Sequence, residues 1–88
     1  MQSVINKAYQ LEVLFEKHSI TEVYANTDFD MHDNNIDVLC ITTKPVDVLP
    51  VWRDMTVLFD RVHIATTCEK YPCVTNKKLI WYHNKWFV

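Results

Sequence analysis

Residues 20–43, ITEVYANTDFDMHDNNIDVLCITT, decide the fold of this chain. The apolar run at 20–25 predicts a strand, and the acid-rich polar residues at 26–35 predict a loop. Residues 36–43 predict a second strand, which is apolar on both faces except at Asp37 and the terminal threonines. Because such strands are typical of the interior of a sheet, we place this one there.

The rest of the chain continues this alternation of helices and strands. The expected elements are helices at 3–18 and 48–61, a third strand at 62–67, and a hairpin of strands 79–82 and 85–88. The hairpin turn is His83-Asn84, where Asn84 tolerates the positive φ that a two-residue turn requires. The prediction is therefore one α/β (α+β) domain spanning 1–88, in the order αββαβ plus a C-terminal β-hairpin. We expect a mixed or antiparallel sheet with two helices on one face.

Composition excludes several classes of protein. The chain has 88 residues, of which 49% are hydrophobic, so it is long enough for one packed core and unlike a disordered segment. It contains no glycine, which excludes the glycine-rich loops that cradle phosphates. The N-terminal residues lack a secretory apolar run, and no stretch has membrane-spanning length. With three cysteines, an odd number, these features favour a cytoplasmic protein with free thiols and no membrane partner.

Charge is distributed unevenly along the chain. Residues 1–60 carry four Lys/Arg against ten Asp/Glu, a net charge of −6. Residues 61–88 carry five Lys/Arg against one Glu, a net charge of +4. This polarity could steer an anionic ligand toward the C-terminal third, or it could only mark two solvated faces of opposite sign.

The order of elements over residues 5–70 resembles the minimal nucleotidyltransferase domain. That family has Gly-Ser after its first strand and two alternating acids on the next strand. This chain has Ala25-Asn26 at the first place and Asn35-Ile36-Asp37 at the second. The resemblance implies that Asp37 would be a ligand of a catalytic Mg²⁺ ion.

The departures from this pattern remove the parts that perform the chemistry. Ala25 adds a Cβ where the family's glycine lets the backbone approach a triphosphate. Asn35 is neutral, and residues 62–67, where the family often has a third acid, contain no Asp or Glu. The resemblance therefore implies a catalytically inactive member with no catalytic residues and no cofactor. The alternative is that residues 35–37 are only the start of a strand.

Two further groups of residues could bind metal. The carboxylates Asp28, Asp30, Asp33 and Asp37 lie in or near the 26–35 loop, but their spacing fails the helix-loop-helix calcium pattern, which favours a solvated acidic loop. Zinc could accept a second set in tetrahedral geometry. This set is His63, Cys68, Cys73 and His83. Its spacing matches no zinc motif, so buried or loop thiols are the favoured interpretation.

Function is expected from surfaces rather than from catalysis. The leading hypothesis is a small non-catalytic binding or regulatory protein, of accessory or inhibitor type, that acts through protein contact; its short glycine-free chain resembles small phage-encoded proteins. A homodimer is another form of this contact. The first alternative is a Mg²⁺-dependent nucleotidyltransferase or nucleotide binder that uses Asp37. The second is a nucleic-acid-binding module, because the C-terminal hairpin interleaves basic and aromatic residues.

These hypotheses assign specific residues. The partner-binding set is Trp81, Trp86, Lys77, Lys78, Lys85, Phe29 and Asp30. Because one face of the hairpin must cover the core, we expect either Trp81 or Trp86, but not both, to be largely exposed. On the second helix, the spacing of Trp52, Met55 and Phe59 predicts that all three are buried against the sheet.

Overall fold

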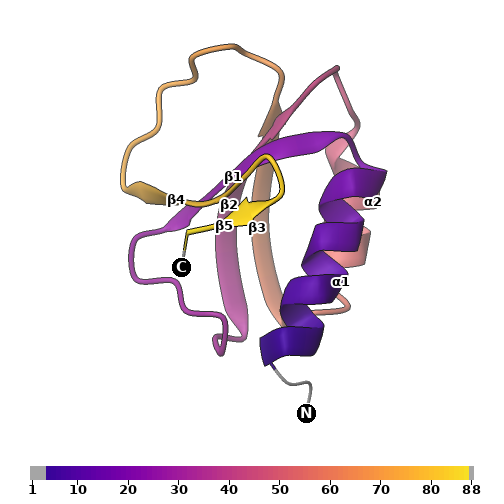
Figure 1. The fold of residues 1–88 in the computed structure, drawn as a ribbon, viewed down its shortest axis with the longest axis vertical. Coiled ribbons are helices and arrows are strands. Elements are labelled where there is room, and N and C mark those ends of the chain that lie inside the picture. Colours follow the sequence, from indigo (N-terminus) through magenta and orange to yellow (C-terminus); the bar gives the residue numbers. More distant parts are fainter. Residues whose placement is uncertain (1–3, 88) are drawn as a thin grey trace.

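A computed structural model describes residues 4–87 and shows a single small α+β domain (Figure 1). Its elements are α1 (Val4–Lys17), β1 (Ile20–Asn26), β2 (Asn35–Thr42), α2 (Val48–Met55), β3 (Arg61–Thr67), β4 (Lys77–Tyr82) and β5 (Lys85–Trp86). The five strands form one sheet in the order β3-β2-β1-β4-β5. β2 and β3 run parallel and the other neighbours run antiparallel, so the sheet is mixed. Both helices cover the same face, as predicted.

The turns of this glycine-free chain use polar residues in the left-handed region. Among the described residues, four have positive φ: Ser19 (59°), Asn76 (60°), His83 (43°) and Asn84 (69°). Positive φ at both His83 and Asn84 is the signature of a type I′ turn, which matches the right-handed twist of the strands that it joins. The two-residue hairpin turn is therefore confirmed. Ser19 likewise takes a positive φ in the turn between α1 and β1.

The second helix is shorter than predicted. It ends at Met55 rather than at 61, although the backbone N–H of Phe59 still donates to the carbonyl of Met55 at 3.0 Å. The chain must then join the sheet, because the N–H groups of Asp60 and Arg61 both donate to the carbonyl of Asn34 beside β2. The parallel pairing of β2 and β3 therefore ends the helix, and helical spacing alone does not show this.

The hydrophobic core lies between the helices and the sheet. Its buried members come from both helices, from β1, β2 and β4, from the 27–34 loop and from Phe59 after α2. Met55 and Phe59 belong to this core as predicted, but Trp52 does not, since it is 42% exposed. Trp52 follows the buried Val51 and so lies about a quarter turn further round α2, where its indole N–H donates to the carbonyl of Val62 at 3.3 Å.

Candidate functional site

Asp37 lies on the face of the sheet opposite the helices. Its carboxylate is half-exposed and forms an ion pair with Lys77, with Nζ 3.3 Å from Oδ1. Its backbone N–H donates to the side-chain oxygen of Asn26 at 3.3 Å. His63 is the residue beside Asp37 in the parallel register of β2 and β3. A hollow of about 400 Å³ is bordered by Asp37, His63, Cys73 and Lys77, among other residues.

The donor set around this hollow does not fit a metal ion. Within residues 4–87 no three His, Cys, Asp or Glu side chains come close enough to hold one. Asp37 is paired with a lysine, whereas Mg²⁺ in phosphoryl-transfer sites is held by acids and substrate phosphates. Of the zinc set, His63 and Cys73 border this hollow but Cys68 and His83 do not, so the four residues are not brought together.

We expect Asp37→Ala to leave the fold and any Mg²⁺ response unchanged. The carboxylate is solvated and makes a single surface ion pair, which contributes about 1 kcal/mol or less to the free energy of unfolding. Thermal unfolding and titrations with MgATP and MgCTP check this. Mg²⁺-dependent nucleotide binding by the wild type that is abolished in Asp37→Ala would show that Asp37 is a metal ligand after all.

Neither hairpin tryptophan is largely exposed, so that prediction is wrong. Trp81 is 2% exposed, and its ring centroid lies 4.8 Å from that of Phe15 in α1. Trp86 is half-buried, and its indole N–H donates to Oε1 of Glu12 at 2.6 Å. The register of β1 against β4 skips Ile80, and this irregularity buries both Ile80 and Trp81. The hairpin therefore closes the core beneath α1.

The basic residues of the predicted partner set are also dispersed. Lys77 pairs with Asp37, and Lys78 donates to the carbonyl of Phe29 at 2.9 Å. Phe29 is itself buried, so it anchors the 27–34 loop to the body of the domain. Of the remaining members, Lys85 and Asp30 are exposed, on the hairpin and on the loop respectively. These residues do not form one continuous basic and aromatic surface.

A buried lysine that sequence analysis missed holds the acidic loop against α1. Nζ of Lys7 donates to the carbonyls of Met31 and Asp33, each at 3.0 Å. It also lies 4.3 Å from the centre of the Phe59 ring, and burial lowers the pKa of this lysine. The available signal was the position of Lys7, four residues before Leu11 and therefore within the core-facing stripe of the helix.

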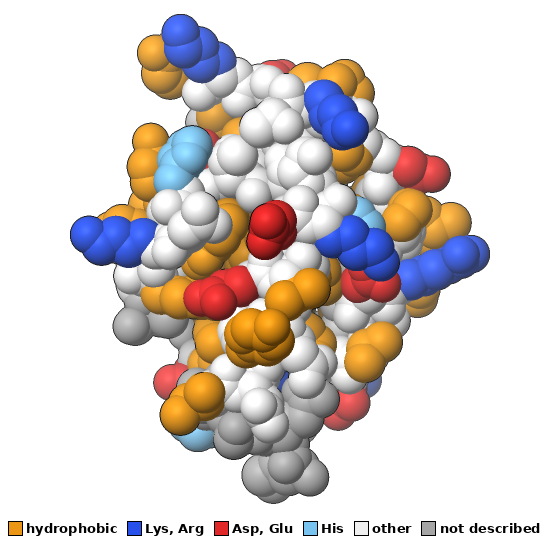
Figure 2. All heavy atoms as spheres, turned by 45° about the vertical axis from the view of Figure 1, so that its right-hand side comes forward, with side chains coloured by type: hydrophobic (Ala, Val, Ile, Leu, Met, Phe, Trp, Pro, Cys, Tyr) orange, Lys and Arg blue, Asp and Glu red, His pale blue; other side chains and the backbone are white. Residues whose placement is uncertain are grey.

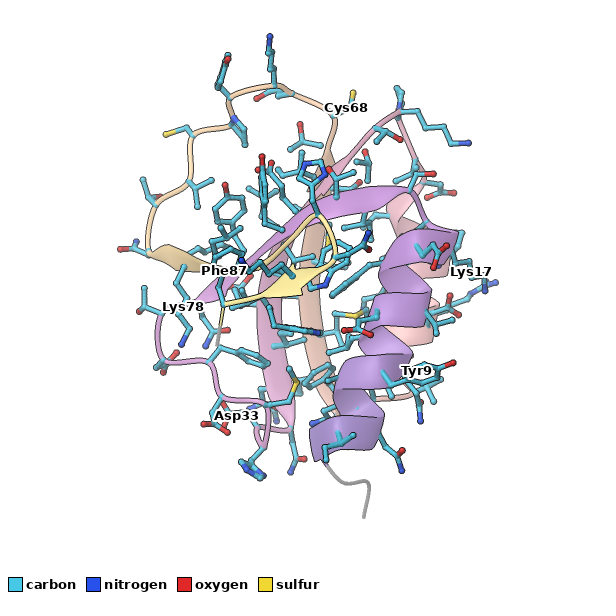
Figure 3. All side chains as sticks on the ribbon, viewed as in Figure 1. Tyr9, Lys17, Asp33, Cys68, Lys78 and Phe87 are labelled. Carbon is cyan, nitrogen blue, oxygen red and sulfur yellow. The ribbon has the colours of Figure 1, made fainter. Side chains whose placement is uncertain are left out.

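The outer surface of the helical layer carries a different candidate site. Three apolar residues of α1 follow one another at four-residue spacing on the side away from the sheet, namely Ile5, Tyr9 and Val13. They are 81%, 65% and 49% exposed. Figure 2 shows hydrophobic side chains gathered among charged ones on this face, and in Figure 3 Tyr9 points away from the sheet. The spacing was visible in the sequence, but the core-facing stripe of the same helix obscured it.

Next to this stripe, α1 and α2 enclose a groove of about 450 Å³, called the helix groove below. Its walls are Tyr9, Gln10, Val13, Leu14, Lys17, Asp54, Val57 and Leu58. Charged side chains lie at one end, where the Asp54 carboxylate is 2.7 Å from Nε2 of His18 and 3.1 Å from Nζ of Lys17. The hydrogen bond with His18 lowers the pKa of Asp54, and Lys17 contributes a smaller lowering. The groove is thus apolar along its length and ionic at one end.

Comparison of the chain with protein families, with curated proteins and with solved structures found no match. Neither helix of the described chain has the length and apolar character needed to cross a membrane.

Proposed function

We propose that this protein is a non-catalytic binding module that recognises an apolar segment of another protein in the helix groove. The observation that carries the proposal is the exposure of Tyr9 and Val13 beside this groove. Large apolar residues that rim a concave apolar surface are typical of protein-binding sites. Aromatic residues such as Tyr9 are also enriched among the residues that dominate binding energy.

The shape of the groove favours a different protein over a second copy of this chain. A two-fold contact centred on the groove would set hollow against hollow and leave both unfilled. A partner with a protruding apolar side chain would instead fill the space between Tyr9 and Val57. Glu16 lies three residues after Val13 on the same helix face, so a basic residue beside the apolar anchor would complement it.

Photo-crosslinking in cells of the native host tests the proposal. A photoreactive phenylalanine analogue at position 57, where Val57 is exposed beside the groove, is expected to capture a discrete protein. Tyr9→Asp introduces a charge where the apolar partner would dock, and we expect it to reduce this capture about tenfold or more. Mass spectrometry of the crosslinked band measures both effects.

The matched control places the same analogue at position 71. Tyr71 is exposed in the 68–76 loop and does not line the groove, so this probe is expected not to capture the same protein. Equal capture from both positions, or capture that Tyr9→Asp leaves unchanged, would contradict recognition in the helix groove. Circular dichroism shows whether Tyr9→Asp keeps the fold.

A further inference from the structure

The two edges of the sheet differ in how they are protected. β5 closes one edge with only two residues, whereas β3 closes the other with seven and pairs only with β2. Edge strands are usually shielded by lysine, proline or a bulge. β3 has neither Lys nor Pro, and its register with β2 runs without a break from Arg61 to Thr67. This edge can therefore accept another strand.

The pairing with β2 shows which backbone groups of β3 point outward. The N–H of Arg61 donates to the carbonyl of Asn34, so Arg61 faces β2. In a regular parallel ladder alternate residues face the same neighbour, which leaves the N–H and C=O groups of Val62, Ile64 and Thr66 directed at the free edge. The indole of Trp52 donates to the Val62 carbonyl at 3.3 Å, as this alternation requires, so this outward acceptor would receive a second strand with its other lone pair.

We propose that β3 pairs with the β3 strand of a second copy of this chain, antiparallel and centred on Ile64. The outward groups select this register, because Ile64 then faces Ile64 of the partner copy and Val62 faces its Thr66. Opposite pairs also avoid like charges, since Arg61 faces Thr67 and His63 faces Ala65. The two sheets become one continuous sheet with all four helices on the same face.

The same symmetry brings an apolar strip of α2 against its copy. Val48, Leu49 and Trp52 are exposed and lie within one stripe of the helix, because they are three and four residues apart. The bond from Trp52 to Val62 places this stripe on the side of α2 next to the free edge. A two-fold axis midway between the two Ile64 residues and perpendicular to the sheet sets the two stripes facing each other, so apolar area is buried beside the new strand pair. The helix groove remains open on both copies.

Hydrogen exchange measured by NMR at several protein concentrations tests the strand pairing. In the monomer, the amides of Ile64 and Thr66 are expected to exchange quickly, while those of His63 and Ala65 are protected by β2. As the concentration rises, the dimer should protect Ile64 and Thr66 as well. Fast exchange at these two amides in a dimeric sample would overturn the proposal. A mass that stays at 10.5 kDa at protein concentrations up to about 1 mM would also overturn it, because a Kd above this concentration marks very weak association.

Thr66→Pro is the sharpest variant. It removes an outward N–H and no bond to β2, and proline is tolerated at such edge positions. Each dimer loses two hydrogen bonds, so the Kd measured by sedimentation should rise about tenfold or more, while Thr66→Val dimerises like the wild type. Trp52→Lys sets like charges against each other across the axis and also removes the indole bond to the Val62 carbonyl, and it should weaken the dimer without changing any residue of β3. If neither Thr66→Pro nor Trp52→Lys weakens the dimer, the two copies associate through another surface, and pairing through β3 is refuted. The same conclusion follows if Tyr9→Asp abolishes the dimer instead.

Discussion

Replacing Phe59 with alanine is expected to lower the free energy of unfolding by about 3–5 kcal/mol, the usual range for removing a buried phenylalanine ring. Phe59 is 2% exposed, and its ring centroid lies 6.1 Å from that of Phe29. It also forms the apolar side of the pocket that holds the Lys7 ammonium group. The substitution therefore loosens the 27–34 loop as well as the core. Since a small domain has only about 5–15 kcal/mol of stability, urea unfolding should show a large shift of the midpoint.

Phe87→Ala is the matched control for this prediction. It removes the same side chain from a half-exposed position directly after β5, where we expect a loss of about 1 kcal/mol or less. If Phe59→Ala unfolds at the same urea concentration as Phe87→Ala, the residues after α2 do not contribute to the core as described. The comparison uses one chemical change at two levels of burial, so burial alone separates the variants.

The second large effect is expected at Trp81. Its indole packs on Phe15 beneath α1, and Trp81→Ala should cost about 3–5 kcal/mol in the free energy of unfolding. The indole N–H of Trp81 is buried without a hydrogen-bond partner among the described residues. Trp81→Phe keeps an aromatic ring and removes that N–H, so its cost should stay within about 1.5 kcal/mol.

Thermal and urea unfolding of the two Trp81 variants separate packing from polarity. Near-equal and large losses in both variants would mean that the indole N–H has a stabilising partner, which would contradict the burial of an unpartnered group. A small loss of unfolding free energy in Trp81→Ala would instead indicate that Trp81 is exposed, as the sequence had predicted for one of the two hairpin tryptophans.

The elements of this fold follow from local features of the sequence. Alternating and helical periodicity located both helices and all five strands to within a few residues, except at the C-terminal end of α2. The His83-Asn84 turn followed from the tolerance of Asn for positive φ. Each of these features depends on residues close together in the chain, which is why a single sequence was enough.

The candidate surfaces depended on contacts between distant segments. The skipped residue in the β1–β4 register buried Trp81, and the position of β3 at the sheet edge left Trp52 exposed. The burial of Lys7 required the 27–34 loop, more than twenty residues away, to supply carbonyl acceptors. Periodicity says which side of an element is apolar, but strand order and register decide whether another element covers that side. The sequence therefore determined the elements, and the tertiary structure decided which apolar surfaces remain open for binding.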